Sequence, residues 1–300
     1  MTTQHATPTW ITPSVPTAGA MPDDLRMDAV ELLVHDLDGM IGYYHDAVGL
    51  DVLNHAGASA TLGRGSEHIL TLRQERDLPA GNPRGAGLYH TAILFENQAQ
   101  LAGSLLSMFR KVPQTYTGSA DHLVSEAFYF TDPEGNGLEL YRDRPRSDWQ
   151  IGPDGSVAMA SLPLHPIDFV ETWYDEALSP EGTTATVGHV HLQVGDIPTA
   201  REFYVNKLGF DVILDGGTAL FVSAGGYHHH LGMNTWQSRG AGPRAASLGL
   251  GDVRVTLPSR EDVAELAARL QHHEIQADDD GHALRFKDPW GTVLAASPQD

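Results

Sequence analysis

The sequence contains no cysteine, few basic residues and no long apolar run, and each absence excludes a class of protein. Without cysteine, disulfides and thiolate metal sites are excluded. The 19 Lys and Arg are outnumbered by 39 Asp and Glu, and the resulting charge of −20 argues against nucleic-acid binding, which needs basic patches. No segment approaches the roughly 18 apolar residues of a membrane helix, and the start carries no visible cleavable signal. We therefore expect a cytoplasmic protein that binds neither nucleic acid nor membrane.

The sequence has 300 residues, of which 41% are hydrophobic, and this length allows about two domains. Its clearest feature is a unit that occurs four times. In the stretches 34–52 and 194–212 a strand ends at an Asp that can cap a helix, the helix shows apolar residues at helical spacing, and a Gly ends it before a new strand. The stretches that begin at Leu88 and Leu250 keep the same order without that signature.

These repeats predict an α+β fold of four βαβββ modules, at about residues 26–80, 86–143, 186–237 and 246–297. The predicted domain organisation is a flexible arm at 1–25, a first module pair at 26–143, a Pro-rich connector at 144–185 and a second module pair at 186–300.

Chemistry-bearing residues occupy matching places in some repeats and are missing from others. The turn-and-strand fragment "DPEGNGLELY" carries Glu139, whereas its later counterpart "DPWGTVLAAS" carries Ala295. Histidines stand in the first strands "LYHTAILF" (His90) and "GHVHLQVGD" (His189), and three more follow one another in "GGYHHHLGMNTW".

This layout resembles the vicinal oxygen chelate superfamily, which includes glyoxalase I, bleomycin-resistance proteins and type I extradiol dioxygenases, and within it most closely the branch of small catechol 2,3-dioxygenases. The resemblance implies that pairs of modules form two cups, glyoxalase-like half-barrels, with metal ligands on the first and last strands. Carried over by position, the ligands are His90, Glu139 and His189. The other two modules offer only Ala29, Ala295 and at best Asp252. The metal cup is therefore predicted between modules 86–143 and 186–237.

The activity implied by the resemblance is a metal-dependent extradiol cleavage, in which O₂ is inserted into a catechol-like aromatic diol. Two imidazoles and one carboxylate suit Fe(II) or Mn(II) and leave about three coordination positions open for the diol and O₂. Ni(II) and Zn(II) are also compatible with such donors. We expect Fe(II), a small aromatic diol and O₂ as partners, and a homo-oligomer formed through a module face would fit the sequence.

The resemblance also suggests further site residues. His230 is expected to be the acid–base histidine, with His229 as the inward residue if the alignment is shifted by one, and His228 and His229 are expected to contact substrate. Tyr129, ten residues before Glu139, and His122 match substrate-binding and supporting positions of the dioxygenases.

Two other functions remain open at this point. A glyoxalase-type isomerase or lyase would take a fourth metal ligand from His228, His229 or His230. A non-catalytic binding protein of the bleomycin-resistance kind would show an apolar groove without a metal. A lone strand histidine is more often structural than a ligand, but three residues at three ligand positions favour a metal site.

Overall fold

The computed structural model describes residues 8–11, 19–153, 156–176 and 184–299. Each of the four predicted modules contains a strand, a helix and three further strands. The first two comprise β2 (Arg26–Val34), α1 (Leu37–Gly42) with a π-helical continuation (Tyr43–Val48), β3 (Asp51–Ala56), β4 (Ser59–Arg64) and β5 (Glu67–Gln74), then β6 (Gly87–Phe95), α2 (Gln98–Lys111), a 3₁₀ turn (Pro113–Thr115), β7 (Tyr116–Asp121), β8 (Ser125–Thr131) and β9 (Gly137–Asp143).

The later modules repeat this order after the connector. The connector contains a 3₁₀ turn (Arg146–Asp148), β10 (Val157–Met159) and α3 (Pro166–Trp173). The third and fourth modules comprise β11 (Ala185–Gln193), α4 (Ile197–Arg201) with a π-helical continuation (Glu202–Lys207), β12 (Asp211–Asp215), β13 (Ala219–Ser223) and β14 (Leu231–Asn234), then β15 (Gly249–Leu257), α5 (Arg260–His272), β16 (Ala277–Asp279), β17 (Leu284–Lys287) and β18 (Val293–Pro298). The predicted α+β fold of βαβββ modules is confirmed.

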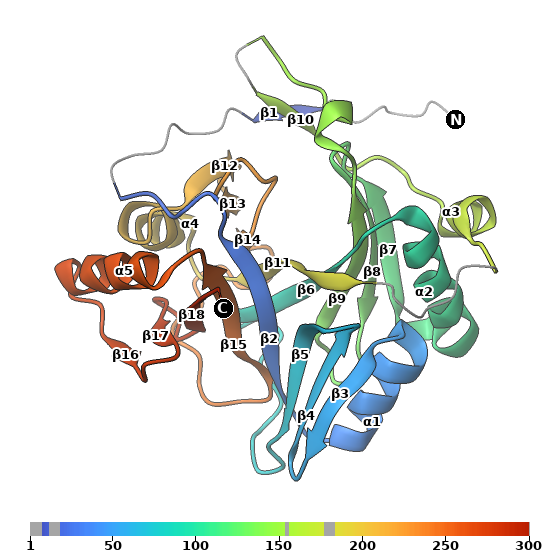
Figure 1. The fold of residues 1–300 in the computed structure, drawn as a ribbon, viewed down its shortest axis with the longest axis horizontal. Helices are drawn as coiled ribbons and strands as arrows, with labels where there is room; N and C mark the ends of the chain where they lie inside the picture. The colour runs from blue at the N-terminus through green and yellow to red at the C-terminus, as the bar shows by residue number, and fades with distance from the viewer. Residues whose placement is uncertain (1–7, 12–18, 154–155, 177–183, 300) are drawn as a thin grey trace.

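The modules pair into two eight-stranded mixed sheets (Figure 1). One sheet has the order β12-β13-β14-β11-β6-β9-β8-β7 and joins the third module to the second. The other has the order β16-β17-β18-β15-β2-β5-β4-β3 and joins the fourth module to the first. In both, the two first strands meet antiparallel at the centre. Each sheet combines one module from residues 26–143 with one module from residues 186–300. The domain bounds at 26–143 and 186–300 stay a prediction.

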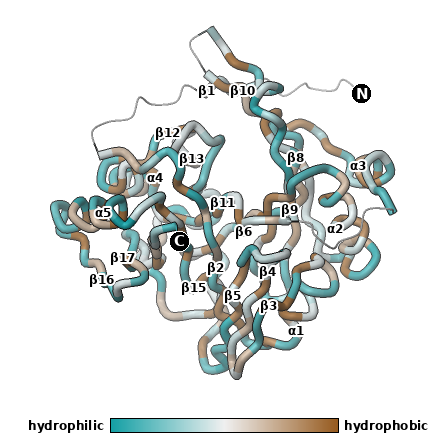
Figure 2. Tube along the Cα trace, viewed as in Figure 1, coloured by the Kyte–Doolittle hydropathy of each residue, from teal (hydrophilic) through white to brown (hydrophobic). Residues whose placement is uncertain are grey.

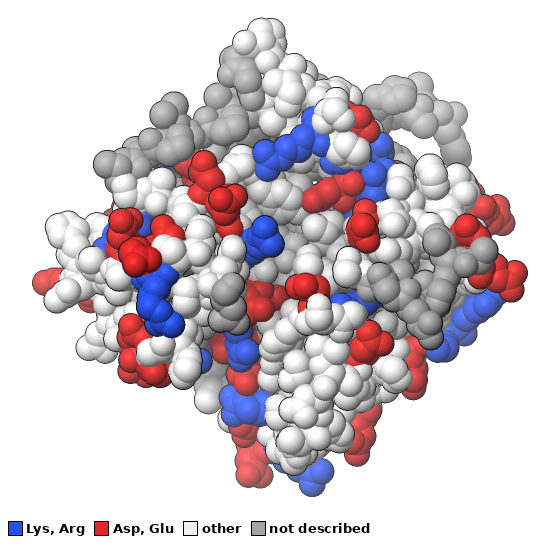
Figure 3. Space-filling view, viewed as in Figure 1, with Lys and Arg blue, Asp and Glu red and all other residues white. Residues whose placement is uncertain are grey.

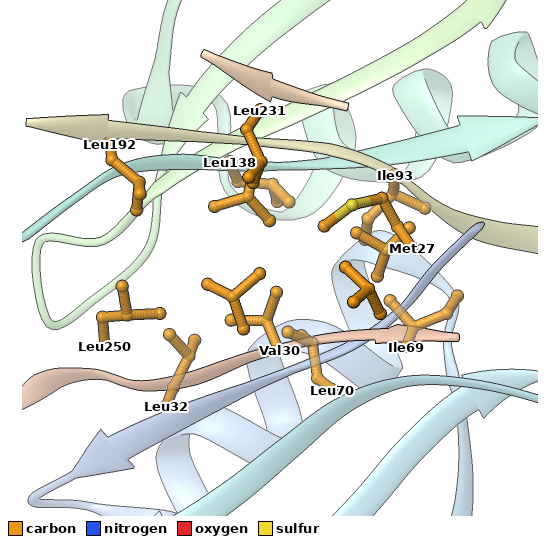
Figure 4. Packing of buried hydrophobic residues seen from close by; sticks show 14 of the residues in the cluster. Met27, Val30, Leu32, Ile69, Leu70, Ile93, Leu138, Leu192, Leu231 and Leu250 are labelled. Carbon is orange, nitrogen blue, oxygen red and sulfur yellow. The ribbon is translucent and has the colours of Figure 1, made fainter. Parts of the chain in front are cut away.

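A hydrophobic core lies between the two sheets and explains which face of each strand is free for a site. Leu192, Leu231 and Ile93 of one sheet face Leu32 and Leu70 of the other (Figure 4). Figure 2 shows hydrophobic residues on these strands and mostly hydrophilic ones along α5. Because side chains alternate along a strand, the neighbours of the core residues point to the outer face of each sheet. We call the outer face of the β6–β11 sheet the site cup, and that of the β2–β15 sheet the second cup.

The repeated Asp-Pro-x-Gly turns tie neighbouring modules together. Tyr44 Oη donates a 2.9 Å hydrogen bond to Asp132 Oδ2, and Tyr204 Oη donates a 3.0 Å bond to Asp288 Oδ2. Burial raises the pKa of both carboxyl groups, and the hydrogen bonds from the tyrosine hydroxyls and the turn amides act in the opposite direction. The two turns therefore share a structural role, and the strands that follow them differ at the site position, where one copy has Glu139 and the other Ala295.

Parts of the expected arm and connector are packed against the body. β1 (Thr9–Ile11) pairs antiparallel with β10, and the two strands form a small separate sheet (Figure 1). Met21 and Leu25, which the sequence placed in a flexible arm, are buried in the core. The remaining arm residues, 1–7 and 12–18, lie outside the described residues. Within the described part of the chain, no helix is both long and apolar enough to cross a membrane.

Candidate metal centre

Three adjacent strands hold the residues that the sequence singled out as metal ligands. His189 lies on β11, His90 on β6 and Glu139 on β9, and β6 runs between the other two. Ala92 of β6 is the register partner of both His189 and Glu139. Its small side chain leaves room between them, while His90, two residues earlier, points to the same face.

The three donor atoms converge. His90 Nε2 lies 3.0 Å from Glu139 Oε2, His189 Nε2 lies 3.2 Å from the same oxygen, and the two ring nitrogens are 3.4 Å apart. The residues are 6%, 3% and 2% exposed in the order His90, Glu139, His189. Among the described residues this is the one group of three or more candidate donors close enough to share a metal ion.

The spacing of these atoms fits a shared cation. At about 2.1 Å from each donor, an ion places neighbouring donors about 3.0 Å apart at right angles and about 3.4 Å apart at tetrahedral angles. The observed distances of 3.0 to 3.4 Å span this range. Two ring nitrogens held against one carboxylate oxygen would otherwise have to share protons among them, and a cation satisfies all three lone pairs together.

The electrostatics of the centre agree with a cation site. Burial by itself would raise the pKa of Glu139, but His189 and His90 outweigh it and keep the pKa well below its ordinary value. Burial lowers the pKa of His189 to about 4, against the attraction of Glu139. The centre is thus a buried carboxylate beside imidazoles whose lone pairs are available to a metal.

The second cup contains no comparable set. Strand register places Ala29, Asp252 and Ala295 where the site cup has His189, His90 and Glu139. The carboxylate of Asp252 is engaged by the Arg254 guanidinium at 2.9 Å, so it is neutralised in place. The described residues of this cup therefore offer no shared-metal group.

The triple histidine is arranged differently from the main sequence expectation. His229 lines the cavity over the metal centre, and its ring centroid is 4.1 Å from that of His189. His230 does not line that cavity; its Nδ1 accepts a hydrogen bond from the Ala224 amide and pairs with Ser223 Oγ at 3.0 Å. The inward residue is the one-residue-shift alternative, His229, because residues 228–230 precede β14 and do not alternate as a strand.

His228 lies behind His229 and is buried away from the cavity. Its Nε2 lies 2.8 Å from Asp143 Oδ1, and its Nδ1 lies 2.9 Å from His229 Nδ1. Since a carboxylate only accepts hydrogen bonds, His228 carries a proton on Nε2, and we assign the Nδ1–Nδ1 bond as donated by His229. This chain fixes the proton of neutral His229 on Nδ1 and leaves its Nε2 lone pair free. Sequence reasoning missed Asp143, the last residue of β9, because its contact with His228 joins segments that lie 85 residues apart.

Tyr129 and His122 form a hydrogen-bonded pair on the opposite wall. Tyr129 faces Glu139 in the β8–β9 register, and both Tyr129 and His122 line the cavity. His122 Nδ1 donates to the Ala160 carbonyl at 2.8 Å, so its Nε2 accepts from Tyr129 Oη at 2.8 Å. Ala160 belongs to the connector, which the sequence treated only as a link.

His191 is a further cavity residue that the sequence analysis did not select. It is the register partner of His90, and Asn234 Nδ2 donates to its Nε2 at 3.1 Å. Burial lowers its pKa well below the ordinary value, so the ring is neutral. The signal was present, because a strand places His189 and His191 on one face.

The fold and this three-donor site define a paired-module member of the glyoxalase-like proteins, and comparisons with known proteins agree. A family model described as Glyoxalase/Bleomycin resistance protein/Dioxygenase superfamily matches residues 186–295. The catechol-2,3-dioxygenase of Bacillus subtilis (strain 168) is 34% identical over 272 residues, which cover 89% of this chain and 95% of that protein. The chain therefore belongs to the glyoxalase/bleomycin resistance/dioxygenase superfamily, as its sequence motifs indicated.

Solved structures share the fold at lower identity. A protein of Bacillus subtilis subsp. subtilis strain 168 superposes with a TM-score of 0.64 at 13% identity, covering 93% of this chain and 86% of the other. Glyoxalase I of Zea mays superposes with a TM-score of 0.54 at 16% identity, covering 92% of each chain. These similarities establish the architecture of the cups. The chemistry has to be argued from the site residues.

Proposed function

We propose that this protein is an extradiol dioxygenase, which opens a catechol-like ring beside its hydroxylated carbons and inserts both atoms of O₂. The observation that carries the proposal is a three-residue donor set, without a fourth candidate among the described residues, bordering a cavity of about 780 Å³. A diol and O₂ need the coordination positions that such a set leaves open. The relationship to a protein named catechol-2,3-dioxygenase supports the same activity.

His90, Glu139 and His189 would hold the metal, and Fe(II) suits both the donors and the reaction. When bound, Fe(II) supplies the electronic link that lets a singlet diol react with triplet O₂. The electrons for the reaction come from the diol, so no external reductant is consumed. The chain's own contribution is to bind and orient the diol, exclude water and move its protons.

His229 is placed to accept a proton from the diol. Its Nδ1 proton is committed to His228, which is itself held by Asp143, so its Nε2 lone pair is the proton acceptor. Burial lowers the pKa of His229 well below the ordinary value, which keeps the ring neutral before the diol binds. A neutral imidazole in contact with the cavity can take a hydroxyl proton and return it to the ring-opened product.

Tyr129 and His122 act on the other side of the bound ring. Because the Tyr129 hydroxyl donates to His122 Nε2, its oxygen lone pairs can accept a hydrogen bond from a diol hydroxyl. The connector carbonyl of Ala160 holds His122 in this tautomer. The pair therefore orients the substrate and can pass a proton between the two side chains.

The other two hypotheses fit the site less well. A glyoxalase-type isomerase or lyase is expected to use a fourth protein ligand, whereas the group of converging donors among the described residues has three members and does not include His229. A binding protein without a metal has no need for a carboxylate that is 3% exposed beside two buried imidazoles, because such burial costs free energy unless the charge is compensated.

The test is an assay of the anaerobically Fe(II)-reconstituted protein with catechol, alkylcatechols and diphenyl diols. We expect one O₂ consumed for each diol and a coloured ring-opened hydroxy-aldehyde acid. His229→Gln should reduce kcat about 10²- to 10⁴-fold, as expected for loss of an acid–base group. Absence of O₂ uptake by the fully metal-loaded protein across this panel would refute the proposal.

A further inference from the structure

The cavity over the metal centre is larger than a single diol ring needs. Its volume of about 780 Å³ lies in the upper part of the range of about 300–1,000 Å³ that holds drug-sized ligands. Catechol itself has eight non-hydrogen atoms. Leu214, Phe221 and Met159 supply apolar wall beyond the ligands. The walls therefore have room, and apolar contact, for a substituent on the ring.

The charge of the lining limits what that substituent can be. Among the described residues that line the cavity, Glu139 is the only acidic one and no Lys or Arg is present. The residues outside the described ranges contain no Lys or Arg in their sequence either. Two arginines of the same region are held by carboxylates, since Arg142 binds Glu126 and Arg144 binds Asp121, both at 2.7 Å.

A substrate carboxylate away from the metal centre would thus enter a cavity whose described lining offers it neutral polar groups but no Lys or Arg partner. Burying an unpaired charge is far more costly than burying an unpaired amide or hydroxyl. The surroundings add repulsion, because the chain carries a formal charge of −20 and acidic side chains are spread over the face in view (Figure 3). Both effects act against ring diols that bear an acid group.

An aromatic wall of the cavity offers favourable contacts to an apolar substituent. Trp236 lines the cavity yet is 53% exposed, and its ring meets Tyr89 edge-on at 5.3 Å between centroids and His191 at 5.5 Å. Phe221 meets His191 edge-on at 5.4 Å. A second ring or a branched alkyl group resting on this wall would cover Trp236 and gain apolar burial and ring contacts.

We infer that the substrate is an uncharged aromatic diol with a bulky apolar substituent, such as a second ring, and not a carboxylated diol. The inference rests on the proposed ring-cleaving function. It adds that the cavity selects by charge and size: the diol binds at the metal centre, and the substituent lies between the Trp236 wall and the Leu214 side.

A matched pair of substrates tests the charge selection. With the Fe(II)-reconstituted protein, we expect the methyl ester of 3,4-dihydroxyphenylacetate to exceed the free acid at least 100-fold in kcat/KM, which corresponds to about 2.7 kcal/mol. We expect 2,3-dihydroxybiphenyl to exceed catechol at least 10-fold. Equal or better turnover of the acid, or of unsubstituted catechol, would overturn the inference.

Binding measured without turnover separates this inference from the proposed function. Anaerobic calorimetry with the Mn(II)-loaded protein should show the ester and the biphenyl diol binding at least 10-fold more tightly than the acid and catechol. If no diol is cleaved but this order holds, the proposed dioxygenase function fails and the cavity assignment stands. If diols are cleaved without this order, the cavity assignment fails alone.

Two variants locate the selection in the walls. Leu214→Arg places a cation at the cavity and should improve the acid-to-ester ratio of kcat/KM at least 10-fold, whereas the matched apolar control Leu214→Met should leave that ratio within 2-fold. Trp236→Ala should lower kcat/KM for 2,3-dihydroxybiphenyl at least 10-fold more than for catechol. An unchanged acid-to-ester ratio in Leu214→Arg, or equal losses for both diols in Trp236→Ala, would contradict the assignment.

Discussion

Metal-dependent stabilisation should depend on Glu139 and not on its counterpart in the second cup. A cation that binds only the folded protein stabilises it by about 2.7 kcal/mol when its free concentration is 100 times its Kd. With an unfolding entropy of about 2.1 cal/mol/K per residue, 300 residues give about 0.63 kcal/mol/K. The expected rise in Tm with Mn(II) is therefore about 4 °C.

Glu139→Gln removes the one anionic donor, whose oxygen lies 3.0 and 3.2 Å from the two histidine nitrogens. Loss of a supporting residue alone can weaken metal affinity 10- to 100-fold, so loss of this donor should weaken it at least about 100-fold. At the same Mn(II) concentration the stabilisation then falls to about 0.4 kcal/mol, or less than about 1 °C in Tm.

The assay is differential scanning fluorimetry of chelator-treated protein with and without Mn(II). Asp252→Asn is the matched control, because it changes a similarly buried carboxyl at the corresponding position of the second cup. We expect it to keep the full metal-dependent rise in Tm. The reasoning is refuted if Glu139→Gln retains the rise, or if Asp252→Asn abolishes it.

Three further predictions follow from individual contacts. Tyr129→Phe should lower ring-cleavage kcat about 10- to 100-fold through loss of the hydroxyl that pairs with His122, with an unchanged Tm; an unaltered kcat would exclude its role. Tyr44→Phe leaves Asp132 without one buried donor and should lower the free energy of unfolding by about 1–3 kcal/mol in urea titrations; a loss of activity without a loss of stability would contradict this. Burial lowers the pKa of His230 to about 3, so the unfolded chain binds the extra proton and stability should fall as pH drops below about 6.5; His230→Gln should flatten that slope, and an identical slope would disprove the cause.

The sequence predicted the fold and the metal ligands for the same physical reason. Repeated units with capped helices and glycine stops define the modules, and once the modules are aligned, Ala29 and Ala295 stand out as lost counterparts of His189 and Glu139. The convergence of His90, Glu139 and His189 then follows from one strand register, because β6 lies between β11 and β9. Wherever the strands are regular, the alignment of the repeats therefore predicts which side chains lie on the same face of the sheet.

Sequence reasoning failed where backbone and connector geometry decide orientation. Residues 228–230 follow Gly225 and Gly226, both with positive φ, and precede β14, so strand alternation could not tell which histidine faces the cavity. Asp143 and Ala160 contribute through contacts between distant segments, which no local pattern encodes. The cavity walls from the arm and connector, Thr9 and Met159, have the same origin.

The most direct test of the shared-cation claim is a crystal structure of the anaerobically Fe(II)-reconstituted protein, with iron located by anomalous scattering. We predict one iron bonded to His90 Nε2, Glu139 Oε2 and His189 Nε2, with His229 outside the coordination sphere and still hydrogen-bonded to His228. Iron bound elsewhere, or coordinated by His229 as a fourth protein ligand, would contradict the account.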